Sequence, residues 1–282
     1  MPPAVTSTGD AHIEGIFVMQ QIVETAMRAA RAAAGEMLSH WDHLNIDFKA
    51  INDLVTQADV AAERIIKEHI ESAFPTHGIY AEESLERASL FSDHVWIVDP
   101  LDGTTNFANK IPHFSVSIAY AQKGEVQMGL VYDVVKDEMF HAIKGEGAFL
   151  NGAPISVSNK AAVNQSIICT GFAYERGPLM RATLAAVQRL FEANMRGLRR
   201  LGSAALDFCW VACGRLDGYF EYSLKPWDFA AGALILTEAG GRILSHTGTP
   251  FDLNATGAIV SCPDLFDEFV ETVVFSSGGH TQ

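Results

Sequence analysis

Apolar residues recur at helical spacing in the first part of the chain. Between Ile16 and Met37 they return every three or four positions with charged residues between them, which predicts a long amphipathic helix. Thr56 is followed three positions later by Asp59, a spacing typical of a capping box at a helix N-terminus. A second helix is therefore expected to begin near Asp59.

Short apolar runs in the middle of the chain predict strands. The run 95–98 is rich in β-branched residues and stops at Asp99, where a turn containing Pro100 follows. Further runs lie at 79–81, 114–121, 126–132 and 139–143. The connections between the last three are short, which favours an antiparallel sheet.

The pattern then changes to alternating strands and helices. Strands are expected at 166–170, 217–221 and 257–261, and helices at 180–195, 204–212, 227–239 and from Asp264 onward. This alternation predicts an α/β fold. We expect two subdomains that share one site, 14–152 and 153–275, between flexible tails at 1–13 and 276–282.

The chain carries an excess of acidic residues. Of its 282 residues, 34 are Asp or Glu and 20 are Lys or Arg, which gives a net charge of −14 at pH 7. Such a field repels nucleic-acid backbones, so nucleic acid is not expected as a partner. An acidic protein that acts on a phosphate must instead supply its own cations.

Cysteine usage and the first residues favour a cytoplasmic protein. The four cysteines show no CxxC spacing and lie in apolar stretches, which indicates reduced thiols in the core. The first ten residues show neither the basic start nor the apolar run of a signal peptide. No segment approaches the ~20 apolar residues that a membrane-spanning helix needs, so no membrane association is expected.

Several acidic residues stand at the ends of predicted elements rather than on solvated helix faces. Asp99 closes a strand and Asp102 lies across the following turn, so both carboxylates can point into one space. Two carboxylates this close repel each other unless a cation lies between them. Oxygen ligands of this kind suit magnesium, and the Leu101 carbonyl could complete its shell. The alternative is that both acids only cap a turn.

Neighbouring residues extend this acidic group toward phosphate chemistry. Gly103 and Thr104 begin a predicted helix, whose free N–H groups and dipole suit an anion. Glu82, after the strand at 79–81, and Asp228, ahead of an apolar helix, add two carboxylates. Taken alone, Glu82 could be a surface acid and Asp228 a first-turn acid that favours the helix dipole. Together they predict a phosphoryl-transfer site.

These segments resemble the signatures of the inositol monophosphatase family. Segments 99–107 and 227–232 resemble its two main signatures, and 53–59 and 81–84 resemble two further segments. All four occur in the family's order, and the resemblance covers about 16–269. It implies a layered αβαβα fold of the inositol monophosphatase and fructose-1,6-bisphosphatase type, a homodimer, and lithium-sensitive catalysis with Mg²⁺.

The resemblance also implies roles for individual residues. Asp59 and Thr104 match residues that orient the attacking water, and Glu82 is counted with them because it would hold the magnesium that activates this water. The implied metal ligands are Glu82, Asp99, Leu101 through its carbonyl, Asp102 and Asp228. The implied substrate contacts are Leu101, Asp102, Gly103, Thr104, Gly202, Ser203, Ala204, Glu221 and Asp228.

The expected activity is hydrolysis of a small polyol phosphate monoester, with myo-inositol monophosphate as the leading substrate and no covalent phosphoenzyme. Relatives with the same motifs act on fructose 1,6-bisphosphate, histidinol phosphate or nucleotide 3′-phosphates, and a fold does not select among them. A different alternative is a regulatory protein bound to RNA or the transcription machinery, and another is an inactive scaffold. Lys225 is either an exposed loop lysine or a phosphate contact, and Arg199 and Arg200 are candidates for a dimer interface.

Overall fold

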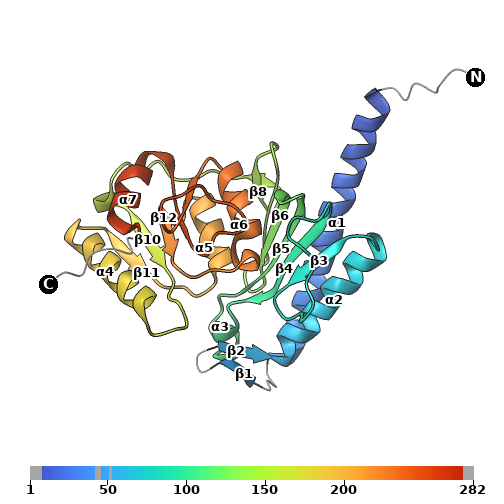
Figure 1. The fold of residues 1–282 in the computed structure, drawn as a ribbon, viewed down its shortest axis with the longest axis horizontal. Helices are drawn as coiled ribbons and strands as arrows, with labels where there is room; N and C mark the ends of the chain where they lie inside the picture. The colour runs from blue at the N-terminus through green and yellow to red at the C-terminus, as the bar shows by residue number, and fades with distance from the viewer. Residues whose placement is uncertain (1–7, 42–45, 51–52, 276–282) are drawn as a thin grey trace, which may run out of the picture.

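The computed structural model describes residues 8–41, 46–50 and 53–275. Helices and sheets alternate in five layers (Figure 1). Helices α1 and α2 cover one face of a seven-stranded sheet, α5 and α6 fill the space between this sheet and a five-stranded one, and α4 and α7 cover the far side. The expected αβαβα layering is confirmed.

The N-terminal half supplies the two outer helices and the larger sheet. Its elements are α1 (Thr8–His40), β1 (Ile46–Ala50), β2 (Asp53–Thr56), α2 (Gln57–Ala73), β3 (Gly78–Ala81), β4 (Val95–Asp102), α3 (Thr104–Ala108), β5 (Ser115–Gln122), β6 (Glu125–Asp133), β7 (Glu138–Ile143), β8 (Ala148–Leu150) and β9 (Ala153–Pro154). Strands β3 to β9 lie in sequence order, with β3 parallel to β4 and the other neighbours antiparallel. The antiparallel sheet predicted for 114–143 is confirmed.

The C-terminal half supplies the smaller sheet and the middle helices. Its elements are the 3₁₀ helix η1 (Val163–Gln165), β10 (Ile167–Thr170), α4 (Pro178–Glu192), β11 (Gly197–Arg199), α5 (Ala204–Ala212), β12 (Gly218–Glu221), α6 (Pro226–Glu238), β13 (Arg242–Ser245), β14 (Ala258–Ser261), the 3₁₀ helix η2 (Pro263–Leu265) and α7 (Phe266–Val273). The strand order is β11-β10-β12-β14-β13. This order, with parallel and antiparallel neighbours, confirms the α/β character of this half.

Strand β4 shows how the sequence builds two cores at once. Val95 and Ile97 face the core that contains α5 and α6, whereas Trp96 and Val98 face the core under α1 and α2. Successive side chains on a strand point to opposite faces, so a strand covered on both faces must be apolar throughout. All eight residues of β4 are buried, which explains the continuous apolar run that predicted it.

The start of the first helix differs from the sequence-based expectation. Helix α1 begins at Thr8, so residues 8–13 are helical although they were assigned to a flexible tail. A helix extends beyond its buried face because each added residue gains a backbone hydrogen bond once the helix has started. Residues 1–7 and 276–282, the rest of the expected tails, lie outside the described residues. The subdomain limits stay a prediction; β9 at Ala153–Pro154, the first two residues of the expected second subdomain, pairs with β8 in the seven-stranded sheet.

The four cysteines are free thiols, as expected. Cys169, Cys209 and Cys262 are buried, whereas Cys213 is half-buried at the end of α5. In the part of the chain that the structure describes, every helix is too short or too polar to span a bilayer.

Candidate active site

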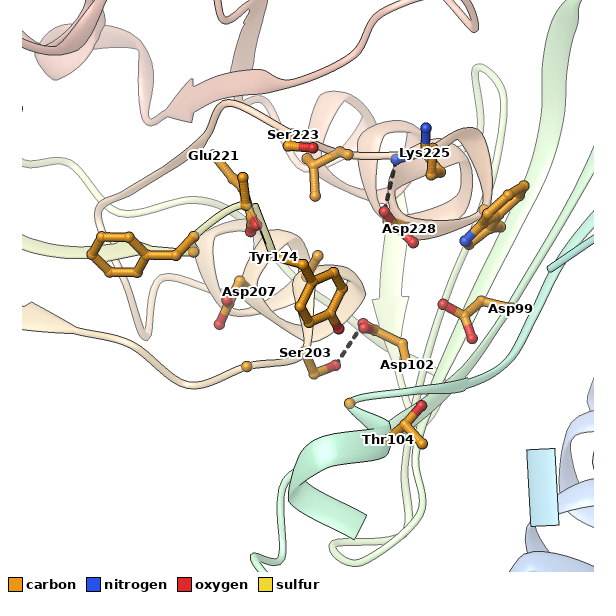
Figure 2. Close-up of a pocket in the computed structure, with 18 of the residues that line it drawn as sticks. Asp99, Asp102, Thr104, Tyr174, Ser203, Asp207, Glu221, Ser223, Lys225 and Asp228 are labelled. Atoms are coloured by element: carbon orange, nitrogen blue, oxygen red, sulfur yellow. Dashed lines mark hydrogen bonds between the residues drawn. The ribbon is translucent and has the colours of Figure 1, made fainter. Parts of the chain in front are cut away.

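A pocket of about 200 Å³ lies between the two sheets, where β4, α3 and the N-termini of α5 and α6 meet (Figure 2). It is lined by most of the residues predicted for the site: Glu82, Asp99, Leu101, Asp102, Gly103, Thr104, Gly202, Ser203, Ala204, Glu221 and Asp228. Asp59 lies behind this lining and reaches it through Thr104. The structure therefore brings together side chains that are up to 169 positions apart in the sequence.

A bulge in β4 aims two aspartates into this pocket. Strand β4 continues to Asp102 instead of ending at Asp99 as expected, and its pairing with β5 is irregular between these two residues. Residues three apart on a regular strand face opposite sides, but an extra residue in a bulge restores the same side. Pro100 has no N–H to donate to a ladder, and a bulge accommodates it. Figure 2 shows both carboxylates turned toward one space.

Each of these acids is held by protein donors. The Leu101 N–H donates to Asp99 Oδ1 at 3.0 Å. Asp102 Oδ2 accepts from the Ser203 hydroxyl at 2.7 Å and from the Ala205 N–H at 2.7 Å. Because Ser203 is the N-cap of α5, the Asp102 carboxylate also lies at the positive end of that helix.

Asp228 and Glu82 approach the same space from two further elements. Asp228 lies in the first turn of α6, and its Oδ2 accepts from the Lys225 N–H at 2.7 Å. Glu82 follows β3, and its N–H continues the pairing of β3 with β4 by donating to the Val98 carbonyl at 3.1 Å. Parallel pairing thus places Glu82 beside the end of β4 that carries Asp99.

Burial raises the pKa values of these acids, and neighbouring carboxylates raise those of Asp99 and Asp228 further. Burial and the charges of Glu82, Asp102 and Asp228 hold the pKa of Asp99 well above its ordinary value. Burial raises the pKa of Asp102 to about 6. Burial and the Asp102 charge also raise the pKa of Asp228. A bound cation would offset this repulsion.

The chemistry of these groups fits magnesium. Four carboxylates and the Leu101 carbonyl offer hard oxygen donors, which Mg²⁺ prefers. Within the described ranges, His, Cys, Asp and Glu side chains nowhere converge in a group of three that is already set for an ion. The aspartates accept the protein hydrogen bonds given above instead, so the individual ligand roles stay predictions.

Thr104 and Asp59 form a hydrogen-bonded pair beside these acids. The Thr104 hydroxyl lies 2.9 Å from Asp59 Oδ1 and 3.1 Å from the Leu101 carbonyl. The other oxygen of Asp59 accepts from Thr56 N at 2.8 Å and Thr56 Oγ1 at 2.6 Å, in the capping box expected at the start of α2. Burial raises the pKa of Asp59. The pair therefore combines a fixed orientation with a carboxylate that accepts a proton readily.

Gly103 allows the chain to turn from β4 into α3. Its φ is 99°, a conformation that residues with a Cβ rarely adopt. A Cβ there would also lie 3.1 Å from the His113 carbonyl and 3.2 Å from the Gly202 carbonyl. The turn leaves the first N–H groups of α3 without partners inside the helix, and they border the pocket beside Asp102.

The opposite wall comes from the C-terminal half. Gly202, Ser203 and Ala204 lead into α5, and Glu221 ends β12. Tyr219 Oη donates to Glu221 Oε2 at 2.7 Å, and burial raises the pKa of Glu221 to about 7. Gly171 leaves room for this carboxylate, since a Cβ there would lie 1.7 Å from Glu221 Oε2.

Some lining residues were not predicted from the sequence. Tyr174, Arg200, Asp207 and Ser223 border the pocket. Lys225, which the sequence offered as a loop lysine or a phosphate contact, stands exposed at the rim. Arg200 was expected at a dimer interface, but the loop before Gly202 directs it to this pocket. Tyr174 and Ser223 come from loops without a sequence pattern. For Asp207 the sequence did hold a signal, because it is an acidic residue inside the otherwise apolar helix α5.

Comparison with known proteins identifies the family. The model of the inositol monophosphatase family matches residues 18–277. "Nus factor SuhB" of Haemophilus influenzae is 45% identical over 248 residues, which are 87% of this chain and 92% of that protein. The chain therefore belongs to the inositol monophosphatase family.

Two solved structures show the same fold. The extragenic suppressor protein SuhB from Bartonella henselae superposes with a TM-score of 0.84 at 35% identity, covering 89% of this chain and 98% of that one. An inositol monophosphatase from Anabaena superposes with a TM-score of 0.79 at 36% identity, covering 90% and 95%. Relatives of this chain thus include a protein named inositol monophosphatase and proteins named Nus factor SuhB.

Proposed function

We propose that the protein is a magnesium-dependent phosphatase that hydrolyses a small polyol phosphate monoester, with myo-inositol monophosphate as the leading substrate. The observation that carries this proposal is the convergence of four carboxylates, the N-terminus of α3 and the Thr104–Asp59 pair on one pocket. Family membership supports phosphatase chemistry.

The residues that would hold Mg²⁺ are Glu82, Asp99, the Leu101 carbonyl, Asp102 and Asp228. When bound, the metal supplies Lewis-acid charge that activates a water and offsets the negative charge of the leaving alkoxide. The protein's part is to hold these oxygens in place on the buried strand β4, directly after β3 and in the first turn of α6.

Thr104 and Asp59 orient the attacking water. The Thr104 hydroxyl has one proton, and when it donates this proton to Asp59 its lone pairs face the pocket as acceptors. A water that donates to Thr104 is thereby fixed in direction, and its proton can pass through the hydroxyl to Asp59. The raised pKa of Asp59 favours this transfer, since a stronger base accepts the proton more readily.

The remaining groups bind the substrate. The N–H groups of Gly103 and Thr104 are placed to hold phosphate oxygens. Glu221 accepts hydrogen bonds from ring hydroxyls of the polyol, together with groups at Gly202, Ser203 and Ala204. Lys225 at the rim adds a positive charge for an incoming anion. From the family's properties we expect a homodimer that lithium inhibits. From the cysteine usage and the first residues we expect a cytoplasmic location.

Phosphate release from a panel of esters tests this function. The panel contains myo-inositol 1-phosphate, fructose 1,6-bisphosphate, histidinol phosphate and adenosine 3′,5′-bisphosphate, each with magnesium and with chelator. Magnesium-dependent turnover that prefers the inositol ester supports the proposal. Preference for another ester keeps the mechanism and changes the substrate, whereas no release from any ester refutes the enzyme proposal.

A second candidate function is a role in the transcription machinery. The observation that favours it is the name "Nus factor SuhB" carried by a relative that is 45% identical. This name speaks against the earlier expectation that nucleic acid is not a partner, which rested on net charge alone. A net charge of −14 favours docking on a basic protein over direct contact with an RNA backbone.

Co-purification of the tagged protein with RNA polymerase subunits, and a mobility shift with structured RNA at physiological salt, test this candidate. Capture of the polymerase without an RNA shift supports docking on a protein. A salt-sensitive RNA shift supports direct RNA binding instead. If both assays are negative, this second function is refuted.

A further inference from the structure

Arg87 makes an unusual set of contacts in the loop that follows β3. Its Nε donates to the Ala81 carbonyl at 2.7 Å, and its Nη2 donates to the Glu82 carbonyl at 2.5 Å. The guanidinium thus binds the two carbonyls that flank the Cα of Glu82. These two hydrogen bonds fix the direction in which the backbone at Glu82 leaves strand β3.

The same guanidinium reaches across to the C-terminal half. Its central carbon lies 4.6 Å from the centre of the Trp227 ring and 5.6 Å from the Tyr80 ring. These two rings also contact each other, with centres 5.6 Å apart. Arg87 therefore covers a junction between β3 and the start of α6, and Trp227 is the residue before Asp228.

The loop is also anchored from its other side. Glu63 of α2 accepts from the Glu83 N–H at 2.7 Å and from the Ser84 hydroxyl at 2.6 Å. Those contacts stay within the N-terminal half of the chain. The contact of Arg87 with Trp227 instead joins the loop of Glu82 to the helix of Asp228.

We propose that Arg87 is a positioning residue that sets Glu82 and Asp228 in register for the same magnesium site. A guanidinium suits this task because its planar fork donates to two carbonyls while its face stacks on an aromatic ring. A lysine provides the charge but not the fork. The proposal rests on the proposed metal-dependent function, and metal binding without turnover tests it.

The test compares Mn²⁺ binding to wild type, Arg87→Ala and Arg87→Lys by electron paramagnetic resonance titration of the full-length protein. We expect Arg87→Ala to weaken Mn²⁺ binding about tenfold, since loss of a group that orients a metal ligand has effects of this size. The affinity of Arg87→Lys for Mn²⁺ should lie between those of wild type and Arg87→Ala. The melting temperature in chelator should remain that of wild type, because Arg87 is exposed and outside the cores.

Arg242→Ala is the matched control. Arg242 is also exposed, lies 4.2 Å from the centre of the Phe266 ring and donates to Asp267 at 2.9 Å. Neither of these partners lines the pocket, whereas Glu82 and Trp227, which Arg87 contacts, both do. Its removal deletes the same kinds of contact and should leave Mn²⁺ binding unchanged. The decisive variant is Arg87→Ala in a Glu82→Gln background, where a smaller further loss is expected because the part of the effect that acts through Glu82 is already gone.

The outcomes separate this inference from the proposed function. If Arg87→Ala binds Mn²⁺ as Arg242→Ala does, the inference is overturned, and turnover by wild type keeps the phosphatase proposal. A loss of equal size with and without Glu82 also overturns it, because Arg87 would then act on the whole fold. If wild type neither binds Mn²⁺ nor releases phosphate, both the inference and the proposed function are wrong.

Discussion

The two walls of the pocket are built in different ways. The wall from the N-terminal half presents Asp99 and Asp102 on a strand that is buried on both faces and paired on both sides. The wall from the C-terminal half presents Ser203 and Asp228 at helix N-termini and Glu221 at a strand end. Rigid elements hold groups more precisely than loops do. We therefore assign chemistry mainly to the first wall and choice of substrate mainly to the second.

The largest expected effect comes from Asp102→Asn. The amide oxygen can still accept from Ser203 and Ala205, so the fold should survive, but the negative charge at the metal site is lost. A metal contributes several kcal/mol to such a reaction, so kcat should fall about 10³-fold. Steady-state kinetics and a melting curve measure this. Asp267→Asn, at an exposed acid on α7, is the control, and equal kcat in the two variants would contradict the assignment.

Thr104→Val should have the next largest effect. Valine keeps the shape of threonine but removes the hydroxyl that donates to Asp59 and that we propose connects the water to it. Proton transfer by a placed group contributes about 10²-fold or more, so kcat should fall by that factor. Thr104→Ser should recover most of the activity. Full activity of the valine variant would show that this wall does not orient the water.

Glu221→Gln sharpens the comparison by changing the second wall alone. Loss of a charged acceptor costs about 1.5–3 kcal/mol, so KM for the polyol ester should rise about tenfold or more while kcat changes less. Gly171→Ala should act in the same direction, because its Cβ would occupy the place of the Glu221 carboxylate. Glu271→Gln, at an exposed position of α7, is the control. A fall in kcat with unchanged KM would contradict the assignment of substrate choice to the C-terminal wall.

The smallest expected effect is on the pH dependence of stability. The pKa of Glu221 is about 7 in the folded protein, above the ordinary 4.5, so the folded state binds more protons between these values. The stabilising contribution of protonated Glu221 is therefore lost as pH rises from about 4.5 to 7. In chelator, the melting temperature of Glu221→Gln should fall less over this range than that of wild type. A steeper fall in the variant would contradict the raised pKa.

The sequence predicted long elements and short motifs better than the path of the chain between them. The capping box of Thr56 and Asp59 was confirmed because it depends only on local spacing. The bulge in β4 was missed, since the run reads as a strand that ends at Asp99. Strands of two or three residues, such as β9 and β11, show too little alternation to be recognised.

The candidate site divides in the same way. Carboxylates that follow apolar strands, such as Asp99, can be found from pattern and spacing. Tyr174 and Arg200 could not, because tertiary packing decides which loop side chains face a pocket. Arg87 was missed for a related reason, since its ring contact with Trp227 joins parts of the chain that are 140 positions apart.

Hydrolysis in ¹⁸O-labelled water tests the central claim, direct attack of an oriented water on phosphorus, most directly. With enzyme in excess over myo-inositol 1-phosphate, in the presence of magnesium, the account predicts one labelled oxygen in the released phosphate and none in the inositol during the first turnover. Acid quenching should then leave no phosphorylated residue. Label in the inositol, or a trapped phosphoenzyme whatever the label in the phosphate, would contradict the account.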